Sequence, residues 1–166
     1  MPAFTQMFRR STKNNGSVNA GLNVLSEKNW KQKLGLVLKN CSEGVNARDE
    51  HERTILMRVT KDSNIEVIKY LVEELKADVN LKDDCGQKAF HMTPSQEIQI
   101  YLLEKGTVIH NSMLMFAAMS NELNVAQVLI EMGINVNHMT SDGQTALKNS
   151  RTSEMRSLLV DYGAFR

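Results

Sequence analysis

Cysteine is scarce in the sequence, with only Cys41 and Cys85 among 166 residues. Two cysteines do not make a disulfide framework, and neither belongs to a CxxC pair. The histidines show none of the HxxxH or CxxH spacings of zinc ligands; they are His51, His91, His110 and His138. We therefore expect no metal site. Free thiols favour a reducing compartment, so we expect a cytoplasmic or nuclear protein.

Long apolar runs and dense charge are missing too. No apolar stretch approaches the roughly 20 residues that cross a bilayer, so we expect no membrane partner. Hydrophobic residues still make up 42% of the chain, which is too many for a disordered protein. The net charge of +1 hides an asymmetry: residues 1–48 hold eight basic and two acidic residues, and the remainder holds twelve basic and seventeen acidic. The basic residues are too dispersed for a nucleic-acid-binding stripe, so we expect no nucleic-acid partner.

Catalytic motifs are also absent. No GxSxG, GxxxxGKS/T, GxGxxG or HExxH pattern occurs, so we predict neither an enzyme nor a cofactor site. His51 stands between Glu50 and Glu52, an arrangement that fits a solvated turn better than acid–base catalysis. The aspartates beside Cys85 should raise the pKa of its thiol and disfavour the reactive thiolate.

Four apolar segments after residue 64 resemble one another. They span residues 65–73, 97–106, 124–133 and 154–164, and in each the apolar residues recur at intervals of three and four. This period predicts one buried stripe on an α-helix. Glycines that would end three of these helices in a left-handed conformation are Gly106, Gly133 and Gly163.

A shorter helix should precede each of these segments. Residues 54–60, 112–118 and 145–147 open with Thr54, Ser112 and Thr145, whose hydroxyls could cap a helix N-terminus. Between the helix pairs, residues 83–87 and 140–144 each carry the glycine that a tight hairpin needs. The repeating unit is thus a hairpin followed by two helices.

This unit resembles the ankyrin repeat, whose period is about 33 residues. The family's Thr-Pro-Leu-His segment is degenerate here, as at residues 54–57, 88–91, 112–115 and 145–148. Its Asp-Val-Asn-Ala-Lys-Asp turn is better kept, at residues 45–49, 78–83 and 135–137. The resemblance implies an all-α ankyrin solenoid of about five units, including caps. It covers residues 45–164.

The spacing of equivalent core positions departs from the family's period. Leu56, Phe90, Leu114 and Leu147 are separated by 34, 24 and 33 residues. The first interval implies one extra residue near residues 74–76. The short interval implies a clipped loop or first helix after His91 and a missing finger hairpin between Gly106 and Ser112. The last unit should be clipped in the same way.

We expect a flexible basic tail at residues 1–16, with a transit peptide as the alternative, and one repeat domain at residues 17–166. Residues 17–48 would form an atypical capping repeat, with helices near residues 18–29 and 30–41. Residues 49–82, 83–107 and 108–139 would form internal repeats. Residues 140–166 would form the C-terminal cap.

The resemblance implies a non-catalytic protein-binding module, an adaptor or an inhibitor, that binds through its finger tips and the concave face of the first helices. A pathogen effector acting on host proteins and a regulatory subunit of an enzyme on another chain are the alternatives. Acidic residues at the early finger tips (Asp49, Glu50, Glu52, Asp83 and Asp84) suggest a partner with a basic segment, and we expect a monomer. The predicted binding residues are Glu50, His51, Arg53, Lys61, Asp62, Asp84, Cys85, Gln87, Met119, Ser120, Ser141, Asp142 and Gln144.

Overall fold

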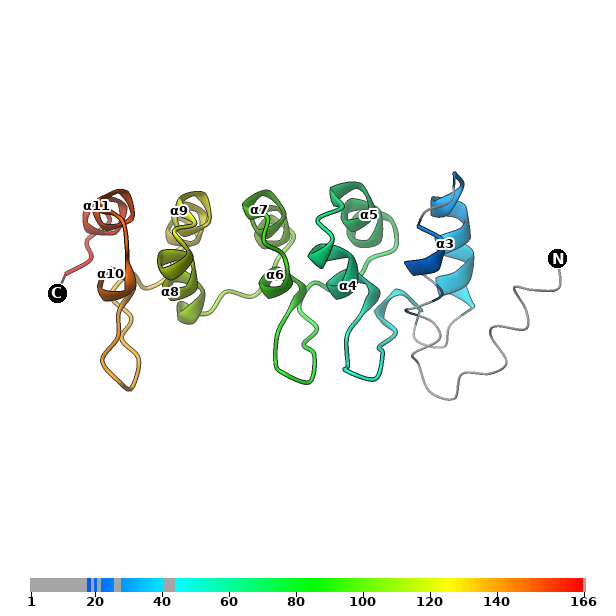
Figure 1. Ribbon diagram of the computed structural model, residues 1–166, viewed down its shortest axis with the longest axis horizontal. Coiled ribbons are helices and arrows are strands. Elements are labelled where there is room, and N and C mark those ends of the chain that lie inside the picture. Colours follow the sequence, from blue (N-terminus) through cyan, green and yellow to red (C-terminus); the bar gives the residue numbers. More distant parts are fainter. Residues whose placement is uncertain (1–17, 19, 21, 26–27, 41–43, 166) are drawn as a thin grey trace.

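Helix pairs stand side by side in a row in the computed structural model (Figure 1). The structure describes residues 18, 20, 22–25, 28–40 and 44–165. The helices are α3 (Trp30–Lys39), α4 (Ile55–Lys61), α5 (Ile65–Lys69) with its continuation η2 (Tyr70–Glu74), α6 (Ala89–Met92), α7 (Gln96–Glu104), α8 (Asn111–Ser120), α9 (Leu123–Glu131), α10 (Ala146–Asn149) and α11 (Ser153–Asp161). A short 3-10 turn, η1 (Gly44–Asn46), follows α3. None of the described helices is long and apolar enough to cross a membrane.

The helices form two rows (Figure 1). We call α4, α6, α8 and α10 the inner row and α5 with η2, α7, α9 and α11 the outer row. Within the described part of the chain, three hairpin fingers project beside the inner row, at residues 49–53, 83–87 and 140–144, each closed by a backbone hydrogen bond between its ends. No strand forms among the described residues; one isolated bridge joins Arg48 and Thr54. The all-α solenoid predicted from the sequence is confirmed.

The core lies between the rows and between successive units. Leu56, Phe90 and Leu114 are buried at equivalent places, as the repeat predicts. Leu147, in the last described unit, is only half-buried. α3 confirms the helix predicted from residue 30. The helix expected at residues 18–29 is described only in part, and the tail at residues 1–16 lies outside the described residues.

Most helix ends follow the sequence signals. Gly106, Gly133 and Gly163 have φ of 91°, 84° and 86°, which confirms the three left-handed helix ends. The Thr54 and Thr145 hydroxyls accept the backbone N–H three residues on, so both N-caps are confirmed. The cap predicted at Ser112 is wrong. α8 already begins at Asn111, because the chain enters it from an extended His110 without a preceding finger.

The extra residue expected near residues 74–76 is absorbed in η2, a π-helical turn. The Ala77 N–H bonds to the Leu71 carbonyl, six residues back. In the later units, the equivalent bond spans five residues, for example from Thr107 to Leu102. Lys76, with φ of 60°, takes the place that glycine fills elsewhere. The wide turn therefore accommodates the extra residue without shifting the helical turns of α5 that precede it.

The clipped units are also confirmed. α6 and α10 have four residues each, whereas α4 has seven and α8 has ten. Residues 105–110 join α7 to α8 directly, without a finger (Figure 1). As a consequence, α4 packs on α6 and α8 packs on α10, but α6 and α8 do not pack closely on each other.

Candidate functional site

Two aspartates hold the first two fingers in shape. The Asp49 carboxylate accepts the N–H groups of His51 and Arg53, each at 2.9 Å. Asp83 does the same in the second finger, accepting from Cys85 and Gln87 at 3.0 and 2.8 Å. Both aspartates are only 6% exposed. The expectation that they form part of an acidic tip is therefore wrong, because their oxygens are used inside the turns.

The remaining oxygens of these aspartates bind arginine. Arg58 of α4 lies 3.4 Å from Asp49, and Arg53 of the first finger lies 3.5 Å from Asp83 of the second. The Asp84 N–H also bonds to the His51 carbonyl at 3.2 Å. The Arg53–Asp83 and Asp84–His51 contacts cross from one finger to the next. The first two fingers therefore form one surface, the finger pair, defined as residues 49–53 and 83–87.

The exposed tip of the finger pair carries Glu50, His51, Asp84 and Cys85. His51 lies 3.4 Å from Asp84 and 3.9 Å from Glu50, nitrogen to oxygen. The hydrogen bond between Cys85 and Asp84 raises the pKa of the thiol and, with help from His51, lowers the pKa of the Asp84 carboxyl. The raised thiol pKa agrees with the expectation from the sequence, and it makes Cys85 a poor nucleophile at neutral pH.

Asp83, Asp84 and Cys85 also place three potential metal-ligand atoms within 4.8 Å of one another. The Asp83 carboxylate already accepts two backbone N–H groups and contacts Arg53. A metal ion here would have to displace these bonds, so the arrangement serves the turn.

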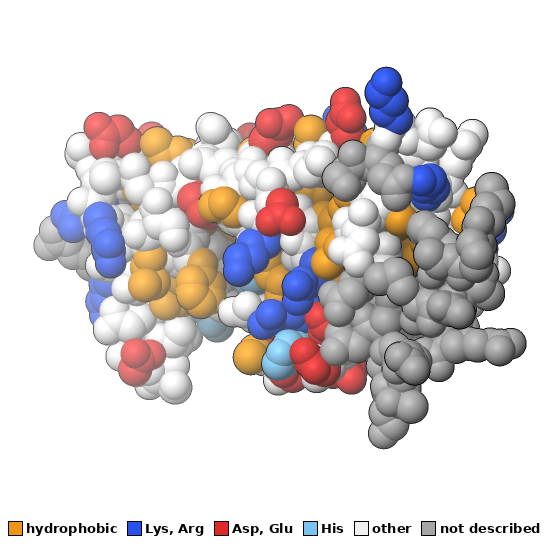
Figure 2. Space-filling view, turned by 45° about the vertical axis from the view of Figure 1, so that its right-hand side comes forward, with side chains coloured by type: hydrophobic (Ala, Val, Ile, Leu, Met, Phe, Trp, Pro, Cys, Tyr) orange, Lys and Arg blue, Asp and Glu red, His pale blue; other side chains and the backbone are white. Residues whose placement is uncertain are grey.

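Four further predicted residues lie at the ends of inner helices. Lys61 ends α4 and Asp62 follows it; Met119 and Ser120 end α8, and all four are exposed. Lys61 and Met119 occupy equivalent places, each five residues after a buried leucine of its helix. Figure 2 shows Lys and Arg side chains gathered over the middle of this face, with apolar side chains beside them over the C-terminal half.

The third finger contributes Ser141, Asp142 and Gln144. A hydrogen bond from the Thr140 hydroxyl lowers the pKa of the exposed Asp142 carboxyl. Gln144 is half-buried, and its N–H bonds back to the Thr140 hydroxyl at 3.1 Å. Because no finger lies between residues 105 and 110, this tip stands apart from the finger pair (Figure 1). The structure therefore divides the predicted finger residues into two groups.

Phe116 and Arg58 were missed by the sequence analysis. Phe116 is 58% exposed on α8, and the Arg58 side chain is 39% exposed at the equivalent place on α4. Each follows a buried leucine by two residues, so the helical period could have found them. Phe116 was missed because it belongs to an apolar stretch, residues 113–118, that reads as core.

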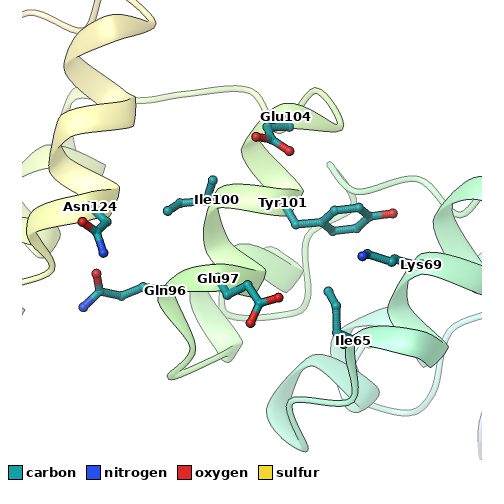
Figure 3. Close-up of a pocket in the computed structure, with 8 residues that line it drawn as sticks. All are labelled: Ile65, Lys69, Gln96, Glu97, Ile100, Tyr101, Glu104 and Asn124. Carbon is teal, nitrogen blue, oxygen red and sulfur yellow. The ribbon is translucent and has the colours of Figure 1, made fainter.

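A shallow depression of about 430 Å³ lies on the opposite, outer row (Figure 3). It is lined by Ile65, Lys69, Gln96, Glu97, Ile100, Tyr101, Glu104 and Asn124, from α5, α7 and α9. The Lys69 ammonium lies 5.8 Å from the centre of the Tyr101 ring. Burial and the bond to Glu73 raise the pKa of the Tyr101 hydroxyl, so this phenol stays protonated. This lining gives no base paired with a nucleophile.

Two ankyrin-repeat family models match the chain, one over residues 51–84 and the other over residues 110–138. The first match begins at the tip of the first finger and reaches the tip of the second. The other covers α8, α9 and the following turn. The α6–α7 unit lies between the two matches. No curated protein matches the sequence.

Proposed function

Because the chain is an ankyrin-repeat protein, we propose that it is a non-catalytic adaptor or inhibitor that grips a protein partner with its fingers and inner row. Ankyrin repeats are generally protein–protein interaction modules. Stacked units of this kind present an extended, rigid surface that suits another protein better than a small molecule.

The observation that carries the proposal is how the side chains divide between packing and solvent. The inner helices bury one stripe against the outer row and leave the other exposed, as Leu114 and Phe116 of α8 show with 1% and 58% exposure. The finger pair is held by Asp49 and Asp83, so its tip is shaped without a partner. A surface already ordered in the free protein loses little entropy on binding.

Affinity capture from native cell extract tests the proposal. We expect partners to be lost from a finger variant, Glu50→Lys with Glu52→Lys and Asp84→Lys, if a basic segment docks on the tips. They should be lost from an inner-row variant, Lys61→Glu with Met119→Ser, if the inner helices bind. A matched outer-row control, Glu97→Lys with Glu104→Lys, should retain them. Equal retention by all four proteins would contradict the proposal.

The same proposal includes a monomer in the cytoplasm or the nucleus. Cys85, an exposed thiol, suits a reducing compartment. Light scattering at low and high salt checks the oligomeric state. A mass above that of one chain at low salt, falling as salt is added, would instead indicate assembly between the basic N-terminal region and the acidic surface of another copy.

A further inference from the structure

The two rows of helices differ in charge. The inner helices α4, α6, α8 and α10 contain no Asp or Glu, whereas they carry Arg58, Lys61 and Lys148. The outer helices, with η2, carry most of the helical carboxylates: Glu66, Glu73, Glu74, Glu97, Glu104, Glu131, Glu154 and Asp161. The electrostatic potential of the solenoid is therefore more positive along the inner helices and more negative along the outer helices.

The inner row also has an apolar centre. α8 carries no charged residue, and it exposes 58% of Phe116 and 38% of Met119, with Met115 half-buried beside them. We call these three residues the α8 patch. Met139, just before the third finger, is 61% exposed. Large apolar side chains gathered on one helix face mark an interaction surface more often than single exposed ones do.

Cations stand on both sides of the α8 patch along the row. α4, with Lys61, lies toward the N-terminus, and α10, with Arg151 just after it, lies toward the C-terminus (Figure 1). Lys61 and Arg151 are exposed, and neither side chain forms a hydrogen bond or an ion pair with another described residue. Figure 2 shows Lys and Arg side chains and the apolar area on one face.

The nearest carboxylates do not neutralise the positive charge of Lys61 and Arg151. Asp62 and Glu122 lie in the turns that lead to the outer row, not on the inner helices. Burial raises the pKa of Glu122, whose carboxylate faces the Gln99 amide at 3.5 Å. The acids of the finger tips lie beyond the helices, at the ends of the hairpins (Figure 1).

We infer that the inner row binds a partner segment that carries large apolar side chains flanked by Asp or Glu. The inference rests on the proposed function and specifies the chemistry of its partner. The apolar side chains cover the α8 patch, and the acidic residues meet Lys61 on one side and Arg151 on the other. Apolar anchors supply most of the affinity of such contacts, and the surrounding charges set orientation and the rate of encounter.

Peptide display with the full chain as bait tests the inference. The probe is a library of random peptides long enough for four helical turns. We expect the enriched peptides to be acidic and to contain Leu, Phe or Trp. Binding of these peptides should fall about tenfold or more in Phe116→Ser with Met119→Ser, because buried aromatic anchors dominate interfaces. It should fall by a smaller factor in Lys61→Glu with Arg151→Glu, and added salt should weaken binding to the wild type.

The matched control is Met132→Ser with Val160→Ser, which removes apolar side chains 43% and 54% exposed from the α9–α11 side. It should bind the peptides as the wild type does, and thermal unfolding should show all variants folded. Enriched peptides that are basic and respond only to Glu50→Lys with Asp84→Lys would overturn the inference and leave the proposed function standing. Failure to enrich any peptide overturns it as well. The capture experiment then decides the proposed function separately.

Discussion

Two joints between neighbouring units are built differently. At the first joint, between the α4–α5 unit and the α6–α7 unit, the inner helices α4 and α6 pack together and the two fingers bond to each other. At the second, between the α6–α7 unit and the α8–α9 unit, the outer helices α7 and α9 pack together and no finger is present. The closest helix packing thus lies on the inner side at the first joint and on the outer side at the second.

Lys88 and Asn80 take over part of the missing finger's role. The Lys88 ammonium donates to the Val108 carbonyl at 2.9 Å and to the Asn80 side chain at 3.3 Å. Asn80 in turn accepts the Val108 N–H at 2.7 Å and donates to the Gly106 carbonyl at 2.9 Å. Lys88 stands where other units have Thr54 and Thr145, and it is only 3% exposed. A short hydroxyl could not reach the link, so the longer side chain spans the distance.

The second joint also buries a poorly satisfied amide. Gln99 is 6% exposed and lies three residues before the buried Leu102, at the position where α9 has Ala126. Its Nε2 reaches the Thr93 carbonyl and Glu122 only at 3.5 Å, and its Oε1 has no partner among the described residues. A buried polar atom without a partner lowers stability. The second joint should therefore be the weaker one.

Core truncations on either side of the second joint should have the largest effect. Leu56→Ala and Leu129→Ala each remove a side chain no more than 1% exposed and should lower the free energy of unfolding by about 2–5 kcal/mol. Repeat stacks unfold in parts when one interface is weak. Hydrogen exchange should show Leu129→Ala deprotecting residues 111–161 before residues 55–104. Uniform loss of protection along the chain would mean that the joints are equally strong.

Removing the Asp83 carboxylate should weaken the first joint. Asp83→Ala leaves two backbone N–H groups and Arg53 without their partner and should lower the free energy of unfolding by about 1–3 kcal/mol. Asp142→Ala, at the tip of the third finger, is the control and should change it little. Urea titrations of the two variants compare them. Equal effects would show that the finger contacts do not hold the joint.

Lys88→Met should change how stability depends on pH. Burial lowers the pKa of the Lys88 ammonium, so between that pKa and about 10.4 the unfolded chain binds more protons than the folded one. The wild type should therefore gain stability, relative to Lys88→Met, as the pH rises through that window. At neutral pH the free energies of unfolding of the wild type and Lys88→Met should differ by only about 1 kcal/mol. The loss of the bond to Val108 is partly offset by the removal of a buried charge. Parallel stability curves from pH 7 to about pH 10 would contradict this account.

Gln99→Leu should strengthen the second joint. Replacing the poorly satisfied amide of Gln99 with an apolar side chain of similar size should raise the free energy of unfolding by about 1 kcal/mol. The substitution should also reduce the difference in hydrogen-exchange protection between residues 55–104 and residues 111–161. Gln127→Leu is the control, because Gln127 is half-buried and bonds to Tyr162 at 2.6 Å. Stabilisation by the control as well would point to a general effect of leucine.

Much of the fold could be predicted from the sequence because helical period and turn glycines act locally. The helix pairs, the left-handed ends at Gly106, Gly133 and Gly163, and the absent finger before α8 all follow from spacing along the chain. Part of the surface could be predicted as well. Met119 is exposed, as are Glu50 and Asp84 at the finger tips.

The roles of several side chains depend on units that lie far away in the sequence. Asp83 is acidic in the sequence, but its carboxylate accepts backbone N–H groups of its own finger and contacts Arg53 of the preceding finger, 30 residues away. Phe116 reads as core and is exposed, and Lys88 reads as surface and is buried. Local sequence is enough to specify which residues form each unit, because a helix and a hairpin depend on neighbours a few residues away. The exposure of Phe116 and the burial of Lys88 follow from the tertiary structure, because burial depends on how the next unit packs.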